Sequence, residues 1–153
     1  MKNNLFFVAS EQRVAKDVAA KVAEFFAMRL FDAVEMFEFD HVPRKIDEVL
    51  TEFGEEYVKK EMRSLAKMQL DFNEAVFVAD IRFLNAFEDL YERIQKKNLV
   101  VFLNNNNSEL NKTIKIKFLA DCCDVAIDVS GLSDEEIFKK VIDEIKAFYN
   151  IEV

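Results

Sequence analysis

The sequence predicts a three-layer α/β domain, in which helices cover both faces of a parallel β-sheet. Three observations support this prediction. Short apolar runs, typical of buried strands, alternate with amphipathic helical segments from end to end. The chain has 153 residues, the length of one ordinary domain with a sizeable core. No internal repeat and no linker rich in proline or glycine interrupts the pattern. We therefore expect one domain over residues 1–153.

The expected strands are short runs of apolar and β-branched residues. The run LVVFL is the clearest of them, because every residue in it is apolar. Continuous apolar runs, rather than alternating ones, indicate strands that are buried on both faces, as in a parallel sheet. In chain order, the expected strands are Leu5–Val8, Leu30–Asp32, Glu74–Asp80, Leu99–Leu103 and Val125–Ser130.

A helical pattern follows the first of these runs. Its apolar residues recur at the spacing of one helix face, and charged residues occupy the other faces. Ser10 has the residue type of an N-cap, and Glu11 would then lie in the first helical turn. The apolar positions of this helix are Val14, Val18, Val22, Phe25 and Phe26.

Further helices are expected along the rest of the chain. Residues 35–53 carry apolar positions at mixed spacing, with Pro43 near a helix start. Ser133 follows a turn at Gly131 and precedes acidic residues, which is typical of an N-cap. The clearest helical patterns cover Glu55–Asp71, Asn85–Lys97 and Glu135–Tyr149.

The chain is acidic, with a formal net charge of −8 and a pI of about 4.8. Nucleic-acid binding needs clustered Lys and Arg side chains to replace the counterions of phosphates, so we expect no nucleic-acid partner. No run is long and apolar enough to cross a bilayer, and the first residues lack the pattern of a signal peptide. We therefore expect a cytoplasmic protein without membrane contact.

The two cysteines, Cys122 and Cys123, are adjacent and cannot form a disulfide framework. A zinc site needs about four ligands, and the single histidine, His41, is far away in the sequence. We expect both thiols to be reduced and free of metal, as small apolar side chains at a strand edge. We expect His41 to be a surface or capping residue.

The turn between the first strand and the first helix raises the question of a phosphate site. Many nucleotide-binding proteins hold phosphate at such a turn, in a glycine-rich loop that ends in Lys-Ser or Lys-Thr. Here the stretch Ala9–Asp17 reads ASEQRVAKD and contains no glycine, and the whole chain has only two glycines. Glycine permits the positive φ and close backbone approach that a phosphate loop needs. Its scarcity argues against a working loop.

The order of these segments resembles the shikimate kinase family, P-loop kinases of similar length, over nearly the whole chain. The words Gly54-Glu55-Glu56-Tyr57 and Ser130-Gly131-Leu132-Ser133 are the most family-like. The stretches that carry the resemblance are NLFFVA, LFDAVEMFE, EFGEEYVKKEM, EAVFVAD, NLVVFL and DVAIDVSGLSDEEI. The resemblance implies five parallel strands and, in the family, phosphoryl transfer from ATP to shikimate.

The phosphate-binding residues of that family are not matched. Aligned without gaps, the family's catalytic lysine falls on Ala15 and its hydroxyl residue on Lys16, with Asp17 next. Lys16 would then lie about 100° round the helix from the lysine's place. Gapping by one residue would align Lys16 but would put Asp17 where the magnesium-binding hydroxyl belongs.

The substrate-binding residues of the family are also altered. The family's Asp-x-Asp word at the second strand keeps only Asp32. Its Phe-Arg dipeptide is Val58-Lys59, and lysine lacks the bidentate fork of arginine. Its glycine triplet is Asp80-Ile81-Arg82. The lid segment is shortened to about residues 104–113, and no arginine follows Arg93.

Our leading hypothesis is a shikimate-kinase-like protein that is not a catalyst and has no catalytic residues or cofactor. It would act as a scaffold, or by binding a protein partner or a second copy of itself. Glu11 would place an internal carboxylate where a phosphate would otherwise lie. The vestigial phosphate loop would comprise Ser10, Glu11, Arg13, Lys16 and Asp17. The remnant of a substrate or anion cleft would comprise Asp32, Lys59, Asp80 and Arg82, of which Asp80 and Arg82 could instead pair with each other.

Three alternatives stay open at the level of sequence. One is a divergent kinase that uses ATP and magnesium to phosphorylate shikimate or another small molecule, since phosphoryl transfer depends mostly on positioning and charge. Another is a sensor of a small anion or nucleotide without turnover, for which Arg13, Lys16, Lys59 and Arg82 would converge on one site. The last is an unrelated α/β domain.

Overall fold

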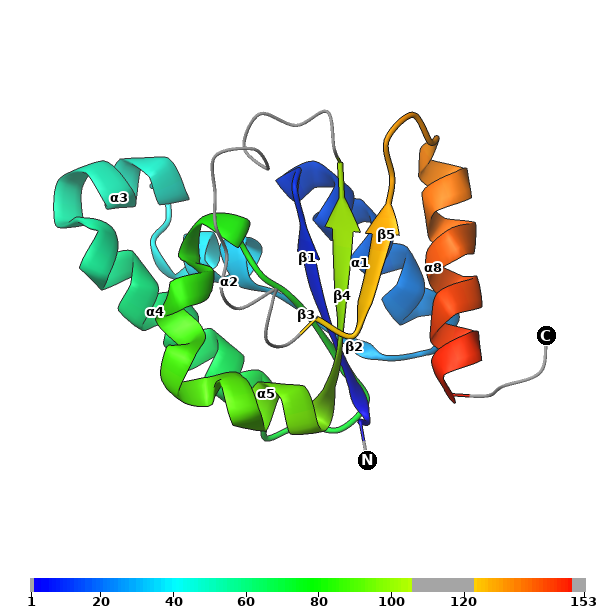
Figure 1. The fold of residues 1–153 in the computed structure, drawn as a ribbon. Coiled ribbons are helices and arrows are strands. Elements are labelled where there is room, and N and C mark those ends of the chain that lie inside the picture. The colour runs from blue at the N-terminus through cyan, green and yellow to red at the C-terminus, as the bar shows by residue number, and fades with distance from the viewer. Residues whose placement is uncertain (1, 106–122, 150–153) are drawn as a thin grey trace.

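The computed structural model describes residues 2–105 and 123–149. It confirms the predicted fold class, because a five-stranded parallel sheet lies between two layers of helices (Figure 1). The expected lid at residues 104–113 lies mostly outside the described residues, as does Cys122. Cys123 is a free thiol, and burial raises its pKa. None of the described helices is long and apolar enough to span a bilayer.

The strands occur close to where the apolar runs predict them. The sheet order is β2-β3-β1-β4-β5, and every neighbouring pair is parallel. Each residue of the inner strands β1 and β3 is buried, as continuous apolar runs require. The bounds are Asn4–Ala9 (β1), Arg29–Asp32 (β2), Ala75–Val78 (β3), Asn98–Asn104 (β4) and Val125–Asp128 (β5).

The helices differ from the expected pattern in two places. The mixed segment 35–53 forms two short helices, α2 and α3, on either side of Pro43, which has no N–H for a helical hydrogen bond. The expected helix Asn85–Lys97 consists of a 3₁₀ segment, η1, followed by α5. The bounds are Gln12–Phe25 (α1), Ala33–Asp40 (α2), Ile46–Phe53 (α3), Glu55–Gln69 (α4), Ile81–Leu90 (η1), Tyr91–Lys97 (α5) and Asp134–Tyr149 (α8).

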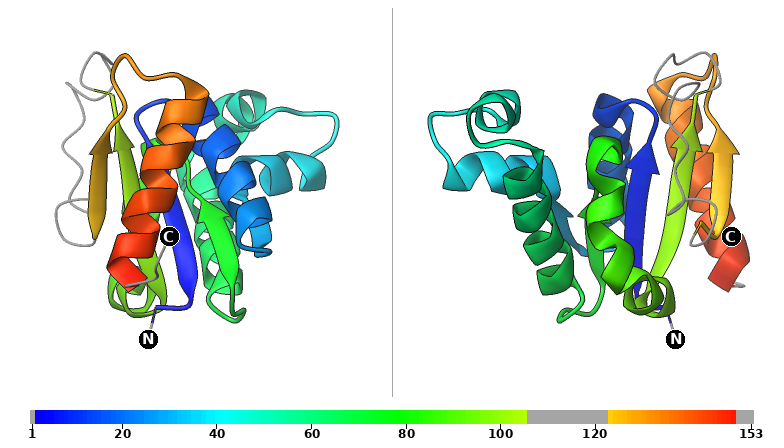
Figure 2. Two further views of the ribbon diagram at one scale, coloured as in Figure 1. Left: turned by 90° about the vertical axis from the view of Figure 1, so that its right-hand side faces the viewer. Right: turned by 60° about the vertical axis from the view of Figure 1, so that its left-hand side comes forward.

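The two faces of the sheet carry separate hydrophobic cores. Successive strand side chains point to opposite faces, so Leu5 and Phe7 of β1 face one layer while Phe6 and Val8 face the other. Helices α1 and α8 cover the first face. Helices α2, α3, α4, η1 and α5 cover the second (Figure 2). The end of the sheet where the strands finish is therefore bordered by helices from both layers.

Buried amides at the other end of the sheet bond to one another and to the backbone. Asn4 accepts a hydrogen bond from the Ala75 amide at 3.0 Å and donates to the Phe72 carbonyl at 2.9 Å. Gln69 donates to Asn98 Oδ1 at 2.9 Å. These bonds join α4 to β1, β3 and β4, so this edge has a structural role.

His41 is the C-cap of α2, in agreement with its expected capping role. Its Nδ1 lies 2.7 Å from the Phe37 carbonyl oxygen, and its Nε2 lies 2.7 Å from the Tyr57 hydroxyl. A carbonyl can only accept, so Nδ1 is the donor in the first bond. His41 thus fastens the end of α2 to α4.

Candidate functional site

The carboxyl edge of the sheet is the place where a parallel α/β protein is expected to bind ligands, at the point where neighbouring strands lead to opposite faces. Here β1 and β3 are neighbours, and β1 leads to α1 on one face while β3 leads to η1 on the other. The residues that follow these strands, together with Asp32 at the end of β2, define the candidate site.

The connection from β1 to α1 is only two residues long, Ser10 and Glu11. Outside glycine, positive φ angles among the described residues occur at Ala27 and Glu74, and neither lies in this turn. A loop that wraps a phosphate needs such angles so that successive N–H groups point inward. The chain here instead passes directly from strand to helix.

Side chains of β4 and the residue after it engage this turn. The backbone amide of Asn105 donates to Ser10 Oγ at 3.1 Å. Ser10 Oγ in turn donates to Asn104 Oδ1 at 3.4 Å. Asn105 Nδ2 donates to the Glu11 carboxylate at 2.6 Å, and Ser130 Oγ donates to Asn105 Oδ1 at 3.2 Å. The turn after β1 is thereby tied to the residues following β4 and β5.

These contacts correct the expected N-cap. Ser10 does not cap α1, because its hydroxyl bonds to Asn104 and Asn105 instead. Glu11 is the N-cap rather than a first-turn residue, and its side chain accepts no hydrogen bond from the helix backbone. The expected contact between the Glu11 carboxylate and the N–H groups of α1 is therefore absent among the described residues.

The cations of α1 pair with carboxylates on different layers. Arg13 lies 3.2 Å from Asp17 and 3.5 Å from Asp134 on α8. Lys16 lies 3.7 Å from Glu35 on α2. Since α8 and α2 cover opposite faces of the sheet, the two cations do not converge on one site.

Asp32 is buried at the end of β2 and is 5% exposed. Its Oδ1 accepts a hydrogen bond from the Glu35 amide at 3.2 Å and so caps α2. Within the described part of the chain, its Oδ2 and both polar atoms of the Gln12 side chain are buried without a partner. Burial raises the pKa of Asp32, an effect that the Glu35 amide and the positive charge of Lys16 oppose.

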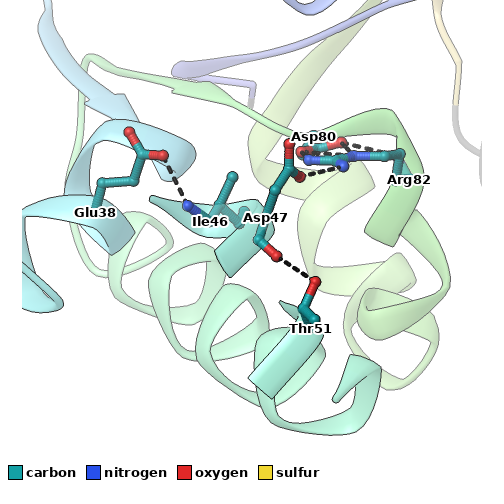
Figure 3. Close-up of polar contacts among 6 residues, drawn as sticks. All are labelled: Glu38, Ile46, Asp47, Thr51, Asp80 and Arg82. Atoms are coloured by element: carbon teal, nitrogen blue, oxygen red, sulfur yellow. Dashed lines mark hydrogen bonds and ion pairs between the residues drawn. The ribbon is translucent and has the colours of Figure 1, made fainter. Parts of the chain in front are cut away.

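Asp80 and Arg82 form an ion pair at the end of β3, as the sequence allowed (Figure 3). Arg82 Nη2 lies 2.8 Å from Asp80 Oδ2, and Arg82 Nη1 lies 2.9 Å from Asp47 Oδ1 on α3. Asp80 also accepts from the Arg82 backbone amide at 3.0 Å and caps η1. Hydrogen bonds to Asp80 raise the pKa of the Arg82 guanidinium further, so its charge is permanent.

Figure 3 also shows what fixes α3 beside this ion pair. Glu38 of α2 accepts a hydrogen bond from the Ile46 amide at 2.8 Å, at the first residue of α3. Thr51 donates to the Asp47 carbonyl at 2.9 Å. The Thr51 bond lies within α3, whereas the Glu38 bond holds the start of α3 to α2, so Arg82 links the end of β3 to a helix already bonded to α2.

Lys59 lies apart from the other site residues. It pairs with Glu55 at 3.1 Å and with Glu56 at 3.7 Å on its own helix. It borders an open hollow of about 430 Å³ between α4 and η1. The residues lining that hollow are Glu56, Lys59, Lys60, Arg63, Asn85, Ala86 and Glu88. Neither Asp80 nor Arg82 is among them.

Three residues at this edge were missed by sequence reasoning: Gln12, Asp47 and Asn105. Asn105 belongs to an asparagine run that reads as polar surface, although its position directly after a buried strand was a usable signal. Asp47 carries no local signal, because its partner Arg82 is 35 positions away.

No protein-family model matches this sequence, and no curated protein matches it in sequence. Solved structures, by contrast, match over almost the entire chain. The class of fold is therefore that of the P-loop kinases, which are three-layer α/β proteins.

Within that class the fold is that of shikimate kinase. The enzyme from Aquifex aeolicus superposes with a TM-score of 0.73 at 11% identity, covering 95% of this chain and 98% of that one. The enzyme from Acinetobacter baumannii, in complex with shikimate, gives 0.73 at 11% identity with 96% and 94% covered. That from Bacteroides thetaiotaomicron gives 0.68 at 16% identity with 96% and 98% covered. Identities this low establish the fold and not the activity.

Proposed function

We propose that this protein has the shikimate kinase fold without its catalysis, and that it acts by binding a partner rather than by transferring phosphate. The observation that carries the proposal is the two-residue turn between β1 and α1. That turn has no glycine, and its side chains are already bonded to Asn104 and Asn105. A triphosphate would have to displace these contacts and would gain no cradle of N–H groups in return.

The charges at the sheet edge support the same proposal. Phosphoryl transfer depends on cations aimed at the transferred group. Arg13, Lys16, Lys59 and Arg82 each pair with carboxylates of the chain itself. This pairing also weakens the sensor hypothesis, in which the same four cations would bind a small anion. The exposed pairs are individually weak, so the dispersal of the four cations supports the proposal as much as their neutralisation does.

The end of β3, where the family would bind its substrate, is occupied by side chains as well. The family's glycine triplet leaves room for an anionic substrate, whereas Arg82 here spans from Asp80 to Asp47. Asp80 adds negative charge at the same place. We therefore infer that shikimate is not a ligand of this protein, although the similar enzyme from Acinetobacter baumannii was solved with it.

A divergent ATP-dependent kinase is the competing function, and the fold similarity favours it. Such an enzyme would use Lys16 for the phosphates and Asp32 for magnesium or substrate. The burial of Asp32, which disfavours its ionised form, counts against that role.

An assay of ADP release separates the two functions. The wild-type protein would be incubated with Mg·ATP, with and without shikimate, beside Lys16→Ala and Lys21→Ala. Lys21 is an exposed lysine of the same helix and serves as the matched control. We expect ADP release at the background rate in all three proteins. Turnover that Lys16→Ala abolishes and Lys21→Ala retains would establish the kinase instead.

A further inference from the structure

The outer face of α2, formed by Glu35, Met36, Phe39 and Asp40, carries an exposed aromatic side chain. Phe39 is 79% exposed, and Val42 in the loop that follows is 73% exposed. The opposite side of the same helix buries Ala33 and Phe37 against the second core. Both α2 and α3 lie at the outer end of their layer, where another molecule can reach them (Figure 2).

The exposure of Phe39 and Val42 leaves apolar surface in water, where its burial by a partner would be favourable. A single exposed leucine or valine is normal on a protein surface, but a large aromatic ring exposed beside a second apolar residue is typical of an interaction surface. Aromatic residues are enriched among those that supply most of the binding energy at protein interfaces. Phe39 has the position and the chemistry of such an anchor.

A small hollow on this face indicates what would bind there. It has a volume of about 240 Å³ and is lined by the four residues of the α2 outer face alone. Met36 and Phe39 supply apolar surface, and Glu35 and Asp40 supply carboxylates. Glu35 forms an ion pair with Lys16 at 3.7 Å, whereas no ion pair to Asp40 occurs within the described residues. A long aliphatic side chain that ends in a cation complements both features.

We propose that the α2 outer face docks a basic amphipathic helix of a partner protein, with an apolar residue against Phe39 and a Lys or Arg beside Asp40. The proposal names a surface for the binding role proposed above and rests on that role. Self-association through this face is disfavoured, because it would bring Glu35 and Asp40 of two copies together in a chain whose net charge is already −8.

The test uses the full-length, ¹⁵N-labelled protein and a 14-residue amphipathic peptide of Leu and Lys as the probe. We expect backbone amide shifts confined to α2 and the loop to residue 45. Phe39→Ser should weaken binding about tenfold or more, as for other aromatic anchors. Phe148→Ser, at an exposed phenylalanine of α8 on the other layer, is the matched control and should leave affinity unchanged. Asp40→Asn should weaken binding and reduce its salt dependence, while Asp143→Asn should not.

Equal affinity of the wild type and Phe39→Ser would overturn the proposal, as would comparable binding of a peptide with Glu in place of Lys. A concentration-dependent dimer that Phe39→Ser abolishes would also overturn it, by identifying a second copy as the occupant. Titrating Mg·ATP into the same sample tests the proposed function separately. Amide shifts at Ser10–Lys16 on adding Mg·ATP would contradict the proposed lack of nucleotide binding. The α2 shifts on adding peptide would still test the docking surface independently.

Discussion

Arg82 bridges two carboxylates that differ greatly in burial, and this difference decides what its removal should cost. The side chain of Asp80 is 3% exposed, whereas that of Asp47 is 77% exposed. Removing the cation would leave Asp80 buried without compensation, and an uncompensated buried charge is much more costly than the loss of an exposed pair.

We therefore predict that Arg82→Met lowers the free energy of unfolding by about 2–3 kcal/mol. This is less than for a fully buried pair, because the Arg82 side chain is itself 38% exposed. Asp47→Asn, which removes only the exposed partner, should cost less than about 1 kcal/mol. Urea unfolding of both variants measures the difference. Equal losses would show that burial of Asp80 is not what matters.

Asp32 should make stability depend on pH in the acid range. Its pKa is raised in the folded protein, so the folded state holds the proton more tightly than the unfolded chain does. This contribution is fully present below the unfolded pKa of about 3.9 and is lost as pH rises through the folded pKa. Above that pH, the cost of the charged, buried carboxylate to the free energy of unfolding no longer changes with pH.

Asp32→Asn keeps a capping oxygen for α2 and removes this titration. We expect wild-type stability to fall relative to that of the variant as pH rises from about 4, by roughly 1.4 kcal/mol for each unit of pKa shift. Urea unfolding of both proteins at several pH values between 4 and 7 tests this. A difference that stays constant with pH would mean that Asp32 has an ordinary pKa.

Residue-level predictions from the sequence succeeded where the partners are local. Asp80 and Arg82 are two positions apart at a strand end, and their pairing was an expected possibility that the structure contains. Ser10 failed as an N-cap because its real partners, Asn104 and Asn105, come from a neighbouring strand. Capping rules consider only the local chain, so they cannot include such competition.

At the scale of elements, buried strands were easy to predict and short helices were not. Every expected strand occurs, because continuous apolar runs leave few alternatives in an α/β chain. Helix α2 lacks a clear helical period, since it is only about two turns long and exposes Phe39, and Pro43 separates it from α3. The 3₁₀ segment η1 begins with the Asp80 cap, a local bond to the Arg82 amide that helical periodicity does not encode.

The amide network at the amino ends of the strands should be essential to how the elements join. Asn4→Leu would leave the buried Ala75 amide and the half-buried Phe72 carbonyl without these bonds. We predict a loss of about 2–4 kcal/mol in unfolding free energy, from two unsatisfied groups. Asn3→Leu, at the exposed neighbouring position, is the matched control and should have little effect. Similar losses in both variants would argue against the network.

At the scale of the whole molecule, the fold and its chemistry have different origins. The fold follows from the order of apolar runs and helices, which is why shikimate kinases superpose on this chain at 11–16% identity. Catalysis needs a few residue types at fixed places, and our proposal is that this chain lacks them at the first turn, at the end of β3 and at Lys59. Their partners in space, such as Asp47 and Asn105, became evident only in the structure.

Thermal unfolding of the wild-type protein with Mg·ATP tests the proposed loss of nucleotide binding most directly. A ligand at about 100 times its dissociation constant adds roughly 2.7 kcal/mol to stability, on the order of 5–10 °C for a chain of this size. We predict no change in Tm with millimolar Mg·ATP, because a turn as short as Ser10–Glu11, without positive φ angles, offers a triphosphate no cradle of N–H groups. A rise of several degrees in the wild type and in Lys21→Ala, absent from Lys16→Ala, would contradict it.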